Sequence, residues 1–578
     1  MVEEYESLDW VAFSRNEWDW IMNRTAMKAS TGFYWNVHWV VSLVVALAWS
    51  VPALAQDFSP ITQAPTESPA EADKVTVRAV VLSGNTAFAT SELQDLWQPL
   101  IGQPVTEKEV TNLVNGITQR YLNAGYLNSR ATLASIEADG VVNITVQEGQ
   151  LGPIIIEGTD RLQDYIRARV EMGAGKPLNI RNLEEQLRLL KSDPLFESVD
   201  ASLRPPGIDA DTAEGDQGVS ALVVRVVEAN PVYGQVSLDN YSPPSIGAIR
   251  AGVSVGYRNP LGFGDAVLLS YRPRLEAIGD SYRFDAFYQV PLNPQNGTLA
   301  FSALIDRNRV LTDEFTPLNL RGNSDRFEVE YRQPLIRTPD EEFALSFGIS
   351  YDSGQTFALD QGVPFGFGPD ESGYSESTPL TFGQDYLSRG ANGVWAVRSQ
   401  FRFGTGLLGA TNNSGSIPDG YFFAWLGQVQ RLQKLTDDNF LIMQLDMQLT
   451  PNPLLPMEQF VIGGAQSVRG YRQNVLAADN GIRLSIEDRI AIVKDEEDRT
   501  VFTLAPFFDA GAVWMAAGNP NQIGANQNIL AGLGLGLIYQ PIEGLTMRVD
   551  YAPPLTNLNI RGNNIQDDGL YLGVNYDF

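Results

Sequence analysis

Cysteine is absent from this chain of 578 residues, and histidine occurs once, as His38. His38 lies in a segment with the features of a removable targeting peptide, so the mature chain is expected to lack both thiol and imidazole groups. This excludes Ser-His-Asp triads, cysteine nucleophiles and ordinary zinc sites. Basic residues are also few, because 41 Lys and Arg stand against 69 Asp and Glu, giving a net charge of −28. Nucleic-acid binding through phosphate neutralisation is therefore excluded.

Long apolar runs are missing outside the N-terminal region. Residues 39–49 form a short apolar stretch, followed by Pro52 and the small residues Ala53 and Ala55. This order predicts a secretory signal cleaved after Ala55. The alternative, a single membrane-spanning helix, needs about 20 apolar residues, more than this stretch contains. Since no other segment reaches about 18, any crossing of a membrane must be made by a closed barrel.

The first 55 residues are thus assigned to an N-terminal extension and the signal peptide. Residues 1–26 are acidic, whereas a signal peptide begins with positive charge, so translation is expected to begin at Met27, which Lys28 follows. Residues 56–73 are rich in Pro, Ser and Thr and are predicted to be a linker.

Residues typical of strands and turns are plentiful. The chain has 21 Tyr, 27 Phe, 10 Trp and 52 Gly, and only 19% of its residues are charged. Two tandem modules repeat the order β-α-α-β-β, and we place them at 74–149 and 150–229. In the first module, Asp139-Gly140 marks the hairpin between the last two strands. Both modules are therefore expected to be α+β units.

Beyond Pro231 the sequence alternates apolar and polar residues with a period of two, as in Phe343, Leu345 and Phe347. A soluble sandwich also alternates, but it would not repeat this over about 350 residues without a second fold signal. An apolar row opposite a polar row suits strands between lipid and a watery lumen. Residues 230–578 are therefore predicted to form an all-β transmembrane barrel of 16 antiparallel strands in outer-membrane lipid and lipopolysaccharide. The predicted strands lie at 232–240, 247–259, 265–275, 280–290, 297–309, 324–334, 342–353, 378–388, 392–404, 419–432, 439–450, 481–493, 500–514, 529–540, 543–552 and 569–578.

The last predicted strand has one apolar face and ends on an aromatic residue. This face resembles the terminal signal that the barrel-assembly machinery reads, and an ordinary closing strand is the alternative. The residues on this face are Leu570, Leu572, Val574, Tyr576 and Phe578.

The longest candidate loop, 451–480, carries the sequence Val468-Arg469-Gly470-Tyr471. This sequence resembles the tip of the sixth external loop in the superfamily of outer-membrane barrels with POTRA domains, and the two modules resemble POTRA domains. Together with residues 456–474, this organisation resembles the TpsB transporters of two-partner secretion, which export haemolysins and filamentous haemagglutinins. The resemblance implies a barrel in the outer membrane with two POTRA domains in the periplasm.

The resemblance also implies an internal ion pair. In that family the loop folds back into the lumen, and its arginine pairs with the acidic residue of an F-x-D-x-G motif on the barrel wall. Here Arg469 would pair with Asp509, in a motif that Phe507 and Gly511 complete. Alternation turns Asp509 towards the lumen, and on the preceding strand it turns Glu487 inward as a second candidate partner. If Arg469 were instead a solvated loop charge, neither contact would form.

Such a contact could close the lumen and still be released. At an effective dielectric near 20, opposite charges about 4 Å apart attract by roughly 4 kcal/mol before desolvation is subtracted. The fork of an arginine adds direction that lysine lacks. Gly463, Gly464 and Gly470 are expected to permit the tight backbone path of the loop past the wall.

The predicted function is export without catalysis, cofactor or nucleotide. The POTRA pair would capture an unfolded secreted partner of the TpsA type, a large β-helical adhesin or haemolysin, by adding its strand to an exposed edge. The alternative is a barrel-assembly insertase, although that group usually carries more POTRA domains, and a diffusion porin would need neither modules nor loop motif. The glycine-rich stretch 531–540 precedes no helix and is interpreted as a strand, not a nucleotide site.

Overall fold

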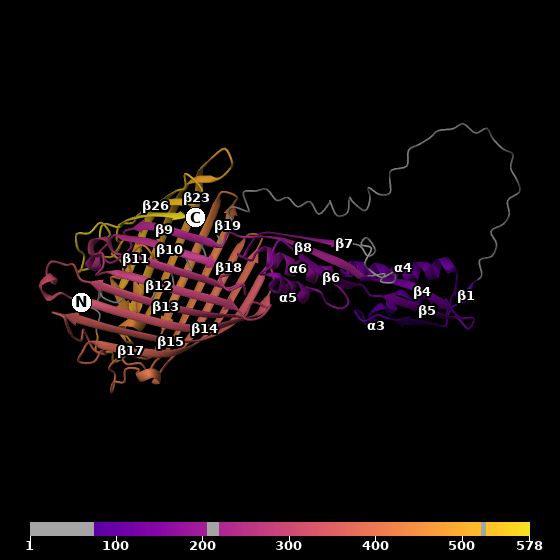
Figure 1. Cartoon of the computed structure of the whole chain (residues 1–578), viewed down its shortest axis with the longest axis horizontal. Helices are drawn as coiled ribbons and strands as arrows, with labels where there is room; N and C mark the ends of the chain where they lie inside the picture. The colour runs from indigo at the N-terminus through magenta and orange to yellow at the C-terminus, as the bar shows by residue number, and fades with distance from the viewer. Residues whose placement is uncertain (1–73, 205–218, 522–527) are drawn as a thin grey trace.

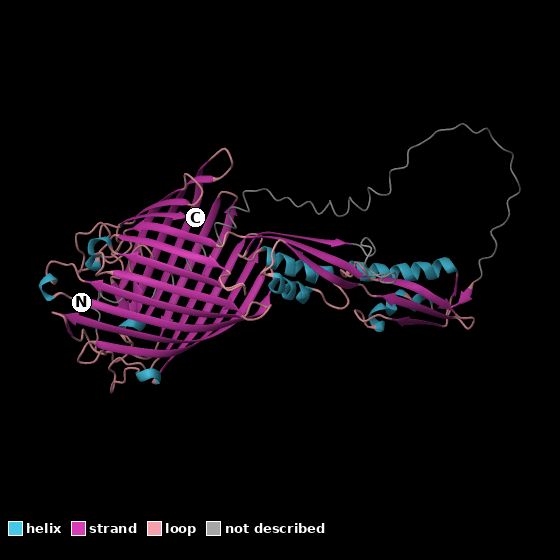
Figure 2. Ribbon diagram, in the orientation of Figure 1, coloured by secondary structure: helices cyan, strands magenta, loops and turns pink. Residues whose placement is uncertain are grey.

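The computed structural model describes residues 74–204, 219–521 and 528–578, so the predicted signal peptide and linker lie outside the described residues. Figure 1 shows an elongated molecule in which two small modules lead into a wide barrel. The longer helices belong to the modules, and strands make up the barrel wall (Figure 2). Among the described residues, no helix is both long and apolar enough to cross a bilayer.

The first module packs one long helix on a small sheet. Thr106 and Glu109 form a capping box that begins this helix, α4. The first of the two expected helices is short: the single turn α3 is followed by two 3-10 turns, Gln94–Leu96 and Gln98–Leu100, and Pro99 lies in the second of them. In the sheet, β5 is central, parallel to β2 and antiparallel to β4. The elements are β1 (Val75–Thr76), β2 (Ala79–Ser83), α3 (Thr90–Leu93), β3 (Pro104–Val105), α4 (Glu107–Asn123), β4 (Arg130–Ile136) and β5 (Val141–Gln147).

The second module repeats this arrangement with two full helices. Its central strand β8 is parallel to β6 and antiparallel to β7. The apolar faces of both helices are buried against the sheet, for example Ile166 and Leu183. The elements are β6 (Gln150–Glu157), α5 (Gln163–Gly173), α6 (Ile180–Lys191), β7 (Phe196–Arg204) and β8 (Val219–Glu228).

Helix α5 and the residues before it attach the second module to two turns of the barrel. Arg161 Nη2 donates to the carbonyl oxygens of Asn259 and Pro260, each at 3.1 Å. Arg169 Nη2 donates to Asn296 Oδ1 at 3.3 Å in the next turn. These contacts place the second module beneath the wall formed by β10 to β13.

The barrel closes through sixteen long antiparallel strands, which confirms the predicted fold class and strand number. Closure joins the last strand to the first, from Gly573 opposite Asp239 to Asp577 opposite Gln235. The strands are β9 (Val232–Asp239), β10 (Arg250–Arg258), β11 (Ala266–Pro273), β12 (Tyr282–Pro291), β13 (Thr298–Arg309), β14 (Arg321–Arg337), β15 (Glu341–Ala358), β17 (Tyr374–Gly390), β18 (Gly393–Thr405), β19 (Phe423–Thr436), β20 (Asn439–Leu449), β23 (Asn480–Lys494), β24 (Thr500–Trp514), β25 (Ile529–Tyr539), β26 (Leu545–Tyr551) and β27 (Leu570–Asp577), with the two-residue β16 (Gln361–Gly362) beside β15.

Side chains alternate between the two faces of the wall. On β25, Leu533, Leu535 and Leu537 are exposed on the outer face, whereas the glycines between them line the lumen. Several strands extend beyond their predicted ends: residues 354–377 were expected to form a loop, but β15 continues to Ala358 and β17 begins at Tyr374. Polar residues such as Ser377 occur in these extensions, so apolar alternation fails there while backbone pairing continues.

Candidate functional site within the barrel

The segment between β20 and β23 forms the candidate site, because it turns into the barrel and packs on the inner wall. Its two limbs pair briefly as the short strands β21 (Phe460–Ile462) and β22 (Leu476–Ala478). Its apolar side chains form one cluster with wall residues of β24 and β25. The buried members of this cluster are Ile462, Val468, Tyr471, Val475, Leu476, Ala478, Val513 and Leu530.

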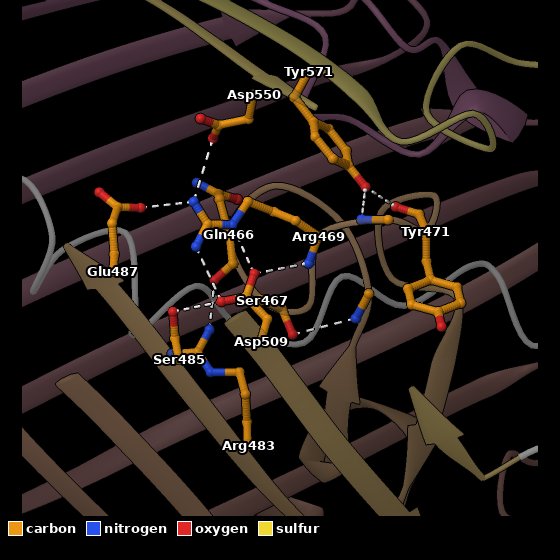
Figure 3. Close-up of polar contacts among 12 residues, drawn as sticks. Gln466, Ser467, Arg469, Tyr471, Arg483, Ser485, Glu487, Asp509, Asp550 and Tyr571 are labelled. Atoms are coloured by element: carbon orange, nitrogen blue, oxygen red, sulfur yellow. Dashed lines mark hydrogen bonds and ion pairs between the residues drawn. The ribbon is translucent and has the colours of Figure 1, made fainter. Parts of the chain in front are cut away.

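Arg469 at the tip of this loop meets three carboxylates (Figure 3). Its Nε and Nη2 donate to the two carboxylate oxygens of Asp509, at 2.6 and 3.0 Å. Its Nη1 donates to Glu487 Oε2 at 2.7 Å and lies 3.5 Å from Asp550 Oδ2. The exposed fractions are 3% for the arginine side chain and 0% for Asp509. The structure therefore brings Arg469 together with both of its predicted partners.

The register of β23 and β24 explains how the carboxylates converge. Ser485 lies opposite Asp509, and Glu487 lies opposite Phe507, so four inward positions form one patch. Ser485 Oγ donates to Asp509 Oδ1 at 2.6 Å and orients this carboxylate. The ring of Phe507 lies under the guanidinium, whose Cζ is 3.2 Å from the ring centroid. Arg469 thus has ionic contacts along its edges and an aromatic contact on its face.

The free energy that this ion cluster contributes to stability depends on its burial. Buried charges pay a desolvation cost that only good geometry offsets, so the net gain of the pair is small. Removing one member is different, because it leaves a charge buried without its partner and typically costs about 3–5 kcal/mol. The bidentate contact between Arg469 and Asp509 has the geometry that such burial requires.

Two further arginines balance the charges on the wall. Arg548 donates to Glu487 Oε2 at 2.7 Å and to Asp550 Oδ2 at 2.8 Å. Arg489 Nε donates to Glu487 Oε1 at 2.8 Å. The cluster therefore contains three arginines and three carboxylates, and two of the arginines belong to the wall itself.

Glycines allow the loop tip to approach the wall. A Cβ on Gly532 would lie 1.9 Å from the carbonyl oxygen of Arg469, and one on Gly511 would lie 3.1 Å from Val468 Cγ2. Gly470 has φ +108° and faces Ala552 and Pro554. Side chains at Gly511 and Gly532 would therefore displace the tip.

The expectation for Gly463 and Gly464 needs correction. Both have positive φ, at +114° and +95°, but they face the returning limb of the loop, not the barrel wall. A Cβ on Gly463 would lie 2.5 Å from Val475 Cγ1, and one on Gly464 would lie 2.6 Å from Gln473 Cα. They permit the loop to fold tightly on itself, because its two limbs touch at this point.

Tyrosines on either side of Gly470 complete the tip. Tyr571 Oη, from β27, accepts from the amide of Gly470 at 2.8 Å and donates to the carbonyl oxygen of Tyr471 at 2.5 Å. Tyr471 Oη contacts both the backbone of Ala531 and that of Thr556, between 2.8 and 3.2 Å. The tip is thus held by backbone contacts as well as by charge.

The sequence interpretation missed Asp550, Arg548, Tyr571 and Gly532. Alternation could have found the first two, because Met547, Val549 and Tyr551 occupy the outer face of β26 and leave Arg548 and Asp550 inside. No sequence signal distinguished Gly532 from the neighbouring glycines, because its role depends on the position of the loop.

The residues predicted to form the assembly signal lie on β27, except Phe578, which directly follows it. Leu572, Val574, Tyr576 and Phe578 are exposed on the outer face, and Leu570 is half-buried. Their recognition by the assembly machinery stays a prediction.

Comparison with known proteins assigns this architecture to a family. The family model described as haemolysin secretion/activation protein ShlB/FhaC/HecB matches residues 218–539. This chain belongs to that family. A second model, the POTRA domain of ShlB type, matches residues 75–149.

Named relatives agree with the ShlB/FhaC/HecB assignment. The chain is 25% identical over 440 residues to the outer membrane transporter CdiB of Escherichia coli, covering 73% of this chain and 69% of the relative. It is 23% identical over 426 residues to the hemolysin transporter protein ShlB of Serratia marcescens, covering 72% of each chain. The solved structure of CdiB from Escherichia coli matches with a TM-score of 0.69 and 23% identity, over 93% of this chain and 95% of that one.

These findings confirm the predicted family, fold and location. The protein is an outer-membrane transporter of the ShlB/FhaC/HecB family, with α+β POTRA structure on the periplasmic side. Its transport role is that of the secretion pores in this family, and the insertase alternative is not favoured.

Proposed function

We propose that this transporter exports a large secreted β-helical partner of the TpsA type, and that loop 451–480 closes its lumen between transport events. The relatives named as transporters of a haemolysin and as CdiB support a secreted protein as cargo. Export requires no catalysis, cofactor or nucleotide in this proposal, since the cargo folds outside. The observation that carries the closure is the buried contact of Arg469 with Asp509 and Glu487.

The closure works as a latch at the loop tip. Val468, Arg469, Gly470 and Tyr471 sit on the wall residues Glu487 and Asp509, with Phe507 below the arginine. When Arg469 leaves, Glu487 keeps Arg548 and Arg489 as partners. Release therefore does not strip that carboxylate of its positive neighbours, which lets the latch reopen and reclose.

Capture of the cargo is assigned to the POTRA sheets. Each three-stranded sheet ends in two strands that pair on one side only, β2 and β4 in the first and β6 and β7 in the second. An extended segment could add to such an edge through backbone hydrogen bonds. We assign residues 74–149 and 150–229 to the two capturing domains and residues 230–578 to the pore.

The test is export of a co-expressed secreted protein of the TpsA type into the medium by cells that make this chain. Arg469→Ala is expected to yield an inserted barrel and at least about a tenfold loss of export, because it leaves the buried carboxylate of Asp509 without its arginine and the loop tip without its ion pairs. Arg499→Ala is the matched control, since Arg499 forms an exposed pair with Asp495 in a turn between β23 and β24. Full export by the Arg469→Ala variant would refute the latch.

A further inference from the structure

A second buried ion cluster lies at the other end of loop 451–480. Glu458 stands in the short 3-10 turn Pro456–Glu458, and its side chain is 0% exposed. The carboxylate accepts hydrogen bonds from both terminal nitrogens of Arg402 on β18 and from Ser377 Oγ on β17, the last at 2.7 Å. The first limb of the loop is therefore fixed to the wall by an arginine and a hydroxyl.

The main chain strengthens this contact. Gln448 Nε2 on β20 donates to the carbonyl oxygen of Glu458 at 2.9 Å and to that of Asp479 at 3.0 Å, and so ties both limbs together. The carboxylate of Asp479 accepts from the amide of Leu454 at 3.0 Å and from that of Ala516 at 2.8 Å. The start of the loop is thus held by side chain and backbone alike.

The two attachments lie on different parts of the wall. Glu458 contacts β17 and β18, whereas Arg469 contacts β23, β24 and β26. Between them in the sequence stand Gly463 and Gly464, adjacent residues that both adopt positive φ. Adjacent glycines can change backbone angles at lower cost than other residues, so they form a natural pivot.

Loss of each contact would have a different cost. At the tip, Glu487 and Asp550 keep Arg548 and Asp509 keeps Ser485 after Arg469 leaves. At the start of the loop, Arg402 would keep Asp352, whose Oδ2 is 3.7 Å from its Nη2, and the ring of Phe422, whose centroid is 5.9 Å from its Cζ. Its Nε already has no hydrogen-bond partner among the described residues. The wall at the tip thus keeps arginines for two of its three carboxylates, whereas Arg402 would lose its close carboxylate and the main chain of Glu458 would also have to leave Gln448; this asymmetry favours movement at the tip.

We infer that Glu458 is a second anchor that stays in place while the tip of the loop swings out of the lumen about Gly463 and Gly464. The inference rests on the proposed latch and adds a fixed point to it. Glu458 is then a positioning residue for transport: it holds the first limb against β17 and β18 so that Arg469 can return to the same three carboxylates.

The absence of cysteine permits a direct crosslinking test in the full chain. A tip pair, Val468→Cys with Gly511→Cys, uses positions where the Cβ of residue 511 would lie 3.1 Å from Val468 Cγ2. A second pair, Ser377→Cys with Met457→Cys, joins the start of the loop to the wall and is called the root pair. At these positions Ser377 Oγ lies 3.9 Å from Met457 Sδ. Each inserted variant is treated with a short bifunctional thiol reagent, and its export is compared with that of the same variant left untreated.

The tip crosslink is expected to reduce export at least about tenfold, and the root crosslink to change it by less than about twofold. If the root crosslink blocks export as strongly as the tip crosslink, the fixed anchor is overturned while the latch stands. If the tip crosslink has no effect, the latch fails and the anchor fails with it.

A second measurement reports on Glu458 itself. Glu458→Gln and Arg402→Gln are each expected to raise the open fraction of single channels in planar bilayers about tenfold, and the double variant is expected to add little, since both remove one contact. Asp385→Asn is the matched control, because this lumen carboxylate binds Arg332 and Arg398 on the wall and not the loop. An open fraction for Glu458→Gln equal to that of the control would overturn the anchor.

Discussion

Two sets of ion pairs line the same barrel, and they differ in whether the loop covers them. The pairs beneath the loop are almost dry: the exposed fractions are 3% for Arg469 and 6% for Glu487. On the opposite part of the wall, Arg272 and Asp285 pair at 3.5 Å with exposed fractions of 17% and 23%. Arg332 and Asp385 pair at 3.3 Å with 26% and 16%. The residue types are the same, so burial and not composition distinguishes these pairs, and at Arg469 the loop supplies the burial.

This comparison shows how one inward row of charges can serve two purposes. Uncovered pairs stay partly solvated and screened, so breaking one costs less than breaking a covered pair, and each pair is close to neutral. Covered pairs cannot lose a partner without leaving a desolvated charge. The covered set therefore fixes a loop, and the uncovered set lines the open part of the lumen.

The largest expected difference comes from a matched pair of conservative changes. Arg469→Lys should reduce export severalfold, because lysine can neither form the bidentate contact with Asp509 nor stack a planar group on the ring of Phe507. Arg272→Lys, on the uncovered wall, should change export little. Export assays of both variants at equal barrel levels check this, and equal losses would mean that covering by the loop does not matter.

A smaller effect is expected from added bulk beneath the loop. Gly532→Val should loosen the tip, because its Cβ would collide with the carbonyl oxygen of Arg469, a backbone atom that cannot turn aside. Gly390→Ala, on β17, meets only an ordinary contact at 3.7 Å and serves as the control. Protease cleavage of the loop in inserted protein measures the change. A loop in the Gly532→Val variant as resistant as in the control would contradict the close seating.

The smallest expected effect is the difference between the exposed and the buried ion pairs in their response to salt concentration. Added salt screens exposed charges and acts much less on buried ones. Raising the salt concentration should therefore change the ion selectivity of channels in the Arg469→Ala variant, where the lumen is open, and leave the closed fraction of the unaltered protein nearly constant. If the closed fraction fell steeply as salt was added, the Arg469 ion pairs would have to be exposed to solvent, which would contradict their burial.

Alternation allowed much of the barrel to be predicted, because each strand has one apolar and one polar face. It placed Asp509 and Glu487 inside, and both lie within reach of Arg469. It failed at the end of β15 and the start of β17, where polar residues such as Gln355 and Ser377 interrupt the apolar row while backbone pairing continues.

The remaining parts of the site depend on distant segments meeting in space. Asp550 and Tyr571 reach the tip because β26 pairs with β25 and β27 pairs with β26 in the closed barrel. Glu458 carried no sequence signal of its own, since its partner Arg402 lies on a strand far earlier in the chain. Pairings of this kind arise from barrel closure and not from local pattern.

The attachment of helix α5 to the barrel turns has a consequence for the direction of traffic. Arg161 and Arg169 hold the second POTRA module under β10 to β13, the side where Arg272 and Asp285 stand uncovered. In the proposed function, a captured segment is therefore handed over beside β10 to β13, whose turns hold the module, and not beside β17 and β18, where Glu458 is attached. That function would then depend on where the module sits around the barrel axis as well as on its edge strands, because the contacts of Arg161 and Arg169 fix this position.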